Sequence, residues 1–218
     1  ALANMSRNKQ NPLDLQWELM GPTNLGGRTR AFIFDKDDPS TMYMGAVSGG
    51  LFKSTNGGRT WFPLAEDLSN MAFVSLHQAS DGTLYAGTGE GLYYFDSGAG
   101  SGGILGAGIF KSTDDGQTWT QIPSTEPSGN GKGTWTSVGK IFSDPNNASR
   151  IYAATNGGLQ VSNDGGQSWS RAINGRSATD LTVASDGTVW VKEGSSIYKS
   201  VTGDANSYTE VTGTGPLT

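Results

Sequence analysis

The chain of 218 residues contains no cysteine and a single histidine, His77. The absence of cysteine excludes a disulfide framework, a thiolate nucleophile and a cysteine-ligated metal. A histidine-based zinc site is excluded as well, because such a site needs more than one imidazole. No segment has the spacing of a calcium loop. We therefore expect neither a metal site nor a cofactor.

Charge is also sparse, at 16% of residues against a usual share of roughly 25%. The 20 acidic residues outnumber the 15 basic ones, and the lysines and arginines are scattered, so we expect no nucleic-acid partner. No apolar run approaches the roughly 20 residues of a membrane helix, and we expect no transmembrane segment. The chain starts at Ala1 without a signal-like segment, which suggests a processed or partial chain.

Glycine is abundant, with 33 residues, about twice the usual share of roughly 7%. The hydrophobic content of 34% can support a buried core. Helical periodicity is absent throughout. This combination is typical of an all-β protein with many short strands joined by tight turns.

A repeat appears when the sequence is aligned with itself. Segments 50–61, 108–119 and 158–169 superimpose without a gap, and a fourth, 196–200, begins in the same way before it diverges. Each copy follows an aromatic-centred strand, which in turn follows an apolar strand. The unit is therefore strand A, turn, strand B, loop, strand C, tight turn and strand D. Successive copies start 58, 50 and 38 residues apart, the range of one propeller blade per repeat.

We therefore predict a β-propeller of four-stranded antiparallel blades at about 28–64, 71–122, 136–172 and 179–212. Residues 1–16 are an N-terminal extension, and residues 17–20, with Trp17, are a strand D without a blade of its own. Such a strand usually completes the last blade of a closed ring, yet 208–211 already supplies a strand D to the fourth repeat. We expect the propeller segment, 17–218, to be part of a larger ring, with a complete four-bladed ring as the alternative.

The turns between strands C and D carry a family resemblance. Their pattern Ser-x-Asp-x-Gly-x-Thr-Trp resembles the Asp-box, or bacterial neuraminidase repeat, of sialidases, sortilin-type receptors, oligoxyloglucan-releasing glycosidases, photosystem assembly factors and large exported bacterial proteins. The matching residues are Ser54, Asn56, Gly58, Trp61, Ser112, Asp114, Gly116, Trp119, Ser162, Asp164, Gly166 and Trp169. The acid or amide accepts backbone N–H groups, the glycine adopts a conformation that other residues resist, and the tryptophan covers the hairpin. The box therefore has a structural role, and the resemblance implies that it lies opposite the ligand site.

A ligand site is expected where the D–A and B–C connections emerge. Arg28 and Arg30 follow a glycine pair there, and they either hold an anionic group bidentately or tie down the D–A connection. The B–C connection of the second blade is about 16 residues longer than the others. Three consecutive aromatics in it either form a recognition loop or pack on the neighbouring blade. Its candidate residues are Glu90, Tyr93, Tyr94, Phe95 and Asp96, and Trp135 in the next long connection is a further candidate.

The sequence favours binding over catalysis. A glycosidase needs two carboxylates about 5 to 10 Å apart, and the candidates are Glu90, Asp96, Asp180 and Glu193. In the xyloglucan-cleaving relatives a catalytic acid stands where this chain has Val47, and the Arg-Ile-Pro motif of sialidases is missing. By resemblance we expect an extracytoplasmic module, secreted, periplasmic or at the cell surface, that binds protein or glycan within a longer protein or assembly. A glycoside hydrolase is the alternative, and a structural domain of a surface assembly is a third possibility.

Overall fold

The computed structural model describes residues 28–64, 67–91, 103–128, 133–173 and 177–211. These residues form four separate antiparallel sheets, each of four strands hydrogen-bonded in sequence order. The prediction of an all-β propeller with four-stranded blades is confirmed. The expected N-terminal extension, 1–16, and the expected strand at 17–20 lie outside the described residues.

Each blade is one continuous stretch of chain. The strands of blade 1 are β1 (Thr29–Phe34), β2 (Met42–Ala46), β3 (Gly50–Ser54) and β4 (Phe62–Leu64). The strands of blade 2 are β5 (Phe73–Gln78), β6 (Leu84–Thr88), β7 (Ile109–Ser112) and β8 (Thr120–Gln121). The strands of blade 3 are β9 (Val138–Asp144), β10 (Asn147–Thr155), β11 (Gly158–Ser162) and β12 (Ser170–Arg171). The strands of blade 4 are β13 (Ala178–Val183), β14 (Val189–Glu193), β15 (Ser196–Ser200) and β16 (Thr209–Glu210). The short 3-10 turns η1 (Pro123–Thr125) and η2 (Thr134–Thr136) connect blades 2 and 3.

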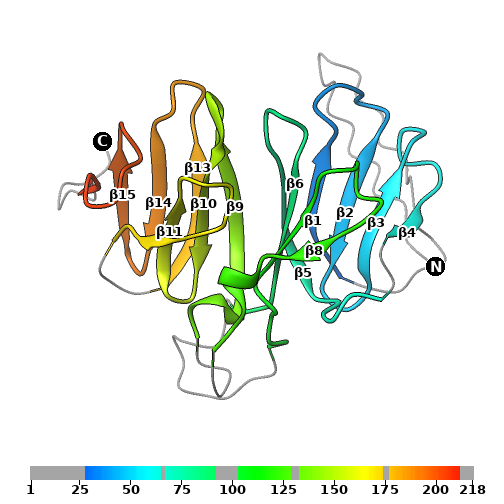
Figure 1. Cartoon of the computed structure of the whole chain (residues 1–218), viewed down its shortest axis with the longest axis horizontal. Coiled ribbons are helices and arrows are strands. Elements are labelled where there is room, and N and C mark those ends of the chain that lie inside the picture. The colour runs from blue at the N-terminus through cyan, green and yellow to red at the C-terminus, as the bar shows by residue number, and fades with distance from the viewer. Residues whose placement is uncertain (1–27, 65–66, 92–102, 129–132, 174–176, 212–218) are drawn as a thin grey trace, which may run out of the picture.

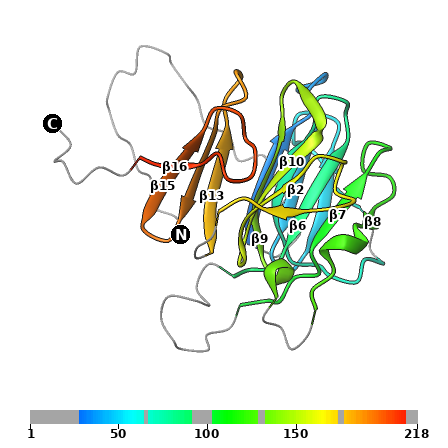
Figure 2. The same ribbon diagram turned by 60° about the vertical axis from the view of Figure 1, so that its left-hand side comes forward.

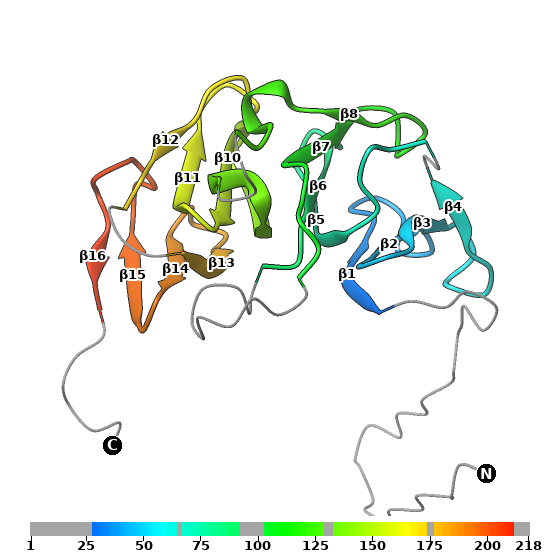
Figure 3. The same cartoon turned by 90° about the horizontal axis from the view of Figure 1, so that it is seen from below.

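The four blades are arranged as a fan. Figure 3 shows them in an arc, with β4, β8, β12 and β16 on the outside and the first strand of each blade towards the centre. Neighbouring first strands pack together, β1 with β5, β5 with β9 and β9 with β13. The long axes of the sheets run roughly side by side (Figure 1), and β8 lies at the outer edge in a second view (Figure 2).

The hydrophobic core includes three layers, one between each pair of neighbouring blades, and a smaller cluster of Met44, Ala46 and Phe52 on blade 1. The largest buried side chains include Tyr43, Tyr85 and Tyr152, which stand at the same place on the second strand of blades 1, 2 and 3. The cross-strand partners of Tyr43 and Tyr85 are Lys53 and Lys111, whose ammonium groups lie 5.1 and 5.6 Å from the ring centroids. Cation–π contacts of this kind stabilise the pair while the lysine stem covers the apolar ring.

Exposed apolar side chains stand on the faces at the two ends of the fan. On blade 1, Phe32 and Phe34 are 47% and 55% exposed. On blade 4, Trp190 and Ile197 are 36% and 42% exposed, and their cross-strand partners are Lys199 and Lys192. The blade 4 face is therefore mixed in character.

The C–D turns of blades 1, 2 and 3 share one hydrogen-bonding pattern. In blade 2, the Gly116 N–H donates to Ser112 Oγ at 2.9 Å, and this hydroxyl donates to Asp114 Oδ1 at 2.8 Å. The same carboxylate accepts from the Thr118 N–H, and the Trp119 indole N–H donates to the Gly116 carbonyl. Blades 1 and 3 repeat these bonds, with an asparagine in the place of the aspartate in blade 1. The turn is thus closed by its own side chains.

The C–D turn of blade 2 also contacts the preceding blade. The carbonyl of Asp115 accepts from Lys53 Nζ at 2.9 Å and from the Tyr43 hydroxyl at 3.3 Å. Gly116, with φ of +80°, packs so closely on Tyr43 that an added Cβ would lie 3.3 Å from the ring. The turn therefore both closes the C–D hairpin of blade 2 and holds blade 1 against it.

Removing the serine hydroxyl should weaken the turn. We expect Ser112→Ala to lower the free energy of unfolding by about 1–3 kcal/mol, because the buried Gly116 N–H loses its acceptor. The measurement is the midpoint of urea-induced unfolding. Thr113→Ala, at the exposed neighbouring position, is the control and should change stability by less than about 0.5 kcal/mol. Equal effects of the two substitutions would contradict the role given to the serine.

The aspartates of the turns should make stability sensitive to acid. Hydrogen bonds from Thr118 and Ser112 lower the pKa of Asp114 to about 2, and those from Ser168 and Ser162 lower the pKa of Asp164 to about 2. The stability that comes from the two charged forms is complete above about pH 4 and is lost as the pH falls through about 2. We expect the double variant Asp114→Asn, Asp164→Asn, which copies Asn56 of the first turn, to lose less stability between pH 4 and pH 2. Urea unfolding at several pH values tests this, with Asp115→Asn as the control, because the Asp115 side chain is exposed within the same turn, and this variant should behave like the unchanged chain.

Candidate binding face

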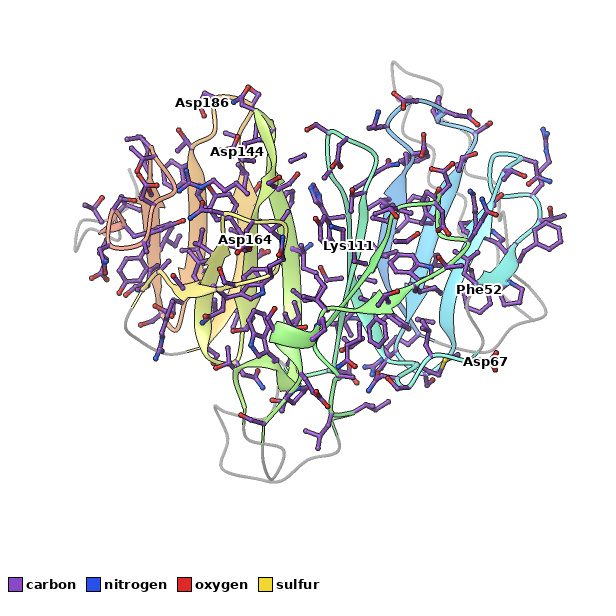
Figure 4. All side chains as sticks on the ribbon, viewed as in Figure 1. Phe52, Asp67, Lys111, Asp144, Asp164 and Asp186 are labelled. Atoms are coloured by element: carbon purple, nitrogen blue, oxygen red, sulfur yellow. The ribbon has the colours of Figure 1, made fainter. Side chains whose placement is uncertain are left out.

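The B–C and D–A connections leave one end of the blades, and the A–B and C–D turns leave the other. Figure 4 shows Asp144 and Asp186, at A–B turns, towards the upper end and Asp67, in a D–A connection, towards the lower end. We call the lower end the connection face, and its longest segments are 65–72, 89–108 and 122–137. In the sequence, the predicted site residues stand in or beside the connections that leave this end.

The two predicted arginines, Arg28 and Arg30 of blade 1, meet the predicted glutamate, Glu90 of blade 2, on this face. Arg28 Nη2 lies 2.5 Å from both carboxylate oxygens of Glu90, and Arg30 Nη1 lies 3.7 Å from one of them. The Glu90 side chain is 9% exposed, whereas that of Arg28 is 58% exposed. One carboxylate therefore faces two guanidinium groups, which leaves a surplus of positive charge at the start of the long connection. An exposed pair of this kind stabilises the fold by no more than about 1 kcal/mol.

The long connection 89–108 is fixed at its beginning by bonds to two neighbouring connections. The Gly89 N–H donates to the carbonyl of Ala72, which precedes blade 2. The hydroxyl of Ser137 donates to the Gly89 carbonyl at 2.9 Å and accepts from the Gly91 N–H at 3.0 Å. Gly89 has φ of +92°, and an added Cβ would collide with the Thr136 carbonyl. Only glycine suits this position, because the backbones approach so closely.

The same connection is fixed again where it returns to blade 2. The Gly106 N–H donates to the Thr136 carbonyl at 2.8 Å, and the Gly108 N–H donates to the Trp135 carbonyl at 3.2 Å. From the other side, Asn70 Nδ2 donates to the Leu105 carbonyl at 2.8 Å. Both ends of the connection are thus held to the D–A connections before and after blade 2. A loop on such a base presents its side chains from a defined position.

The predicted site residues in the middle of this connection, Tyr93, Tyr94, Phe95 and Asp96, lie outside the described residues. Trp135 is described, and its ring packs edge-on against Trp169 with 4.9 Å between the ring centroids. It is half-buried in the layer between blades 2 and 3. Its predicted role in binding stays a prediction, and the structure gives it a packing contact.

Asn70 and Ser137, which fix the connection, are not among the site residues predicted from the sequence. Asn70 and Ser137 are small polar residues just before a first strand, and such residues are common in turns. Their role becomes visible only through partners that lie 35 and 48 positions away in the chain. No local sequence signal identifies those partners.

Asp180 and Glu193 are the other two described acids among the catalytic candidates, and they differ in burial. Asp180 is exposed on β13, and its carboxylate accepts from the Leu181 N–H. Glu193 is buried at the end of β14, 4% exposed, and among the described residues neither of its carboxylate oxygens has a hydrogen-bond partner. Burial raises the pKa of Glu193 to about 7, against the opposing influence of Arg171 and the Leu159 backbone.

Glu193 stands where blades 2 and 3 have a threonine. The hydroxyls of Thr88 and Thr155 donate to the carbonyls of Gly108 and Gly158, at 2.6 and 2.7 Å, and so close the B–C hairpin. The glutamate cannot make this bond while it is ionised, because a carboxylate has no donor. The residue is therefore a local exception to the repeat.

Within the described part of the chain, no cluster of three or more histidine, aspartate or glutamate side chains could hold a metal ion. The described residues also include no helix with the length and apolar character needed to cross a membrane.

No protein-family model and no curated protein sequence matches the chain. Solved structures do resemble it. An ancestral GH74 enzyme is 20% identical, over 84% of this chain and 25% of that one, with a TM-score of 0.64. The extracellular domain of a putative one-component system from B. thetaiotaomicron is 15% identical, over 88% and 23% of the two chains, with a TM-score of 0.63. YCF48 bound to a D1 peptide is 18% identical, over 84% and 55%, with a TM-score of 0.55.

These similarities concern the fold. The chain spans about a quarter of the length of the first two proteins and 55% of the third, and all three are less than 25% identical to it. The arrangement of its blades is therefore that of a β-propeller segment. What each of these proteins binds or cleaves is a property of that protein.

Replacing Glu193 by threonine should remove a loss of stability that occurs as the pH rises through about 7. Because the pKa of Glu193 is raised from 4.5 to about 7, the stability contributed by its neutral form is complete below about pH 4.5 and is lost as the pH rises through about 7. We expect Glu193→Thr to be more stable than the unchanged chain at pH 8 by about 1–3 kcal/mol, with a smaller difference at pH 5. Urea unfolding at both pH values is the measurement. Glu126→Thr, at an exposed glutamate, is the control, and a pH dependence unaltered by Glu193→Thr would refute the assignment.

Proposed function

We propose that this chain is an extracytoplasmic β-propeller module that binds a protein or glycan ligand on its connection face. The observation that carries the proposal is the long connection 89–108, held at both ends by bonds to neighbouring connections. In the sequence, this connection contains three consecutive aromatics and Asp96. A long insertion costs ordering entropy, so a fixed base with exposed recognition groups is typical of a binding loop.

The ion pair beside the loop supports the same role. Glu90 neutralises one of two guanidinium groups, and the exposed Arg28 retains donors that can hold a carboxylate or sulfate of a ligand. Aromatic rings stack on the apolar faces of sugars and also form the centres of protein interfaces. The two classes of ligand therefore use the same groups.

The resemblance of the C–D turns to the Asp-box supports an exported protein, since the resemblance extends to sialidases, sortilin-type receptors and exported bacterial proteins. The structural neighbours point in the same direction: one is an extracellular domain, and another is a propeller bound to a peptide. We propose accordingly that the module belongs to a longer secreted, periplasmic or cell-surface protein.

A hydrolase receives less support, although a neighbour is a GH74 enzyme. The Glu90 carboxylate forms ion pairs with Arg28 and Arg30 of blade 1, so it is already engaged within the fold. Glu193 has the raised pKa of an acid, but it lies buried in the layer between blades 3 and 4. Binding without catalysis is therefore the function that we propose.

Replacing the aromatic trio, Tyr93, Tyr94 and Phe95, tests the proposed binding function. We expect the purified chain to bind either defined sugars on a glycan array or a protein from cell-envelope extract that rebinds in purified form. The triple variant Tyr93→Ala, Tyr94→Ala, Phe95→Ala should weaken this binding at least tenfold, because three contact rings are lost.

Phe62→Ala is the matched control, since Phe62 is an exposed aromatic on the outer strand of blade 1, and it should leave the affinity unchanged. Circular dichroism should give the same melting temperature for the triple variant as for the unchanged chain. Full binding by the triple variant would overturn the proposal, and so would release of reducing sugar from a bound glycan, which would establish a hydrolase.

A further inference from the structure

A groove of about 480 Å³ lies between blades 2 and 3, and its lining comes from residues 111–124 and 165–167. Its walls are β8 with the residues around it and the C–D turn of blade 3. The lining includes Lys111, Thr113, Thr120, Gln121, Pro123 and Gln167. The volume is within the usual range of ligand sites, about 300–1,000 Å³. Figure 4 labels Lys111 on blade 2 and Asp164 on blade 3, the two blades between which the groove lies.

Lys111 has an ammonium group without a hydrogen-bond acceptor among the described residues. It stands 5.6 Å from the centroid of the Tyr85 ring, and no carboxylate pairs with it. The equivalent lysine of blade 1, Lys53, makes the same ring contact but also donates to the Asp115 carbonyl at 2.9 Å. The Lys53 ammonium group thus joins blades 1 and 2, whereas the Lys111 ammonium group remains available in the groove.

The neighbouring acids do not neutralise this lysine. Both oxygens of Asp164 accept hydrogen bonds within their own turn, from Ser162 and from the N–H and hydroxyl of Ser168. Gln167, on the rim, donates to the Asp164 carbonyl. The groove therefore combines one free cation with neutral hydroxyl and amide groups, which suits a ligand with one acidic group.

The second feature of the groove is a strand edge. In the ladder between β7 and β8, the Ile122 N–H donates inwards to the Ile109 carbonyl. Because the bonds of an antiparallel strand alternate in direction, the N–H and C=O of Gln121 point away from β7. β8 is the last strand of its sheet, so within the described part of the chain no fifth strand pairs with these groups. An unpaired strand edge accepts an added strand.

We infer that this groove binds an extended peptide that adds to the edge of β8 and places one aspartate or glutamate side chain against Lys111. The free edge supplies main-chain affinity, and the ammonium supplies selectivity for an acid. A peptide is favoured over a sugar because no aromatic ring lines the groove, so the stacking platform typical of sugar sites is missing. The site goes beyond the function proposed for the connection face and shares no residue with the aromatic trio.

The test uses an array of acetylated, amidated hexapeptides of varied sequence, probed with the purified chain. We expect the bound peptides to be enriched in sequences with one Asp or Glu flanked by β-branched residues. For the strongest of them, titration calorimetry should give an affinity at least tenfold lower with Lys111→Met, which keeps the apolar stem over Tyr85 and removes the charge. Lys199→Met is the matched control, because Lys199 stands at the equivalent place of blade 4, 5.1 Å from the Trp190 ring.

A second pair of variants tests the strand edge. Gln121→Pro removes the outward N–H and should abolish binding, and a proline is tolerated at an edge position that does not donate to the ladder. Gln121→Ala removes only the side chain and its bond to the Ala107 carbonyl, and should retain binding. All variants should keep the circular dichroism spectrum and melting temperature of the unchanged chain to within a few degrees.

The outcomes separate this site from the connection face. The variant Tyr93→Ala, Tyr94→Ala, Phe95→Ala should bind the selected peptides with unchanged affinity. Binding of no peptide on the array, equal binding by Lys111→Met, or retained binding by Gln121→Pro would each overturn the inference. Binding of a glycan that depends on Lys111 would also overturn it, because the groove would then be a sugar site.

Discussion

The structure depends on one buried hydrogen bond that recurs in the C–D turns of blades 1, 2 and 3: a buried glycine N–H donates to the Oγ of the serine that ends the third strand. Because an unsatisfied buried N–H is costly, the serine, the acid or amide beside it and the glycine with positive φ form one unit. That unit closes the hairpin, and in blade 2 its backbone carbonyl also receives Tyr43 and Lys53 from the preceding blade. Closure of a blade and docking of its neighbour are thus stabilised together.

This arrangement leaves the opposite end of the blades free to vary. The C–D turns keep one geometry in blades 1 to 3, whereas the B–C connections range from short hairpins to the long segment 89–108. Exceptions to the repeat are therefore informative. Among the described residues Lys111 lacks the acceptor that Lys53 has, and Glu193 replaces the threonine of blades 2 and 3. Both are places where the chain departs from what the fold alone requires.

Much of the fold could be predicted because its signals are local. The strand order, the four blades and the three closed turns follow from alternating apolar runs and from a box of eight residues whose side chains bond to their own backbone. The connection face could also be predicted, since strand direction fixes which loops share an end. The bonds that fix connection 89–108 could not, because Asn70 and Ser137 find their partners 35 and 48 positions away.

The sequence by itself determined the all-β class, the repeat, the propeller blades and the chemistry of each turn, since these depend on hydrogen bonds and side-chain alternation within a few residues. Only the tertiary structure decided that Arg28 meets Glu90 across 62 positions, that Trp135 packs on Trp169, that Glu193 is buried and that Lys111 faces an open groove. These properties depend on how closely two blades approach each other, and no periodicity within one blade specifies that distance.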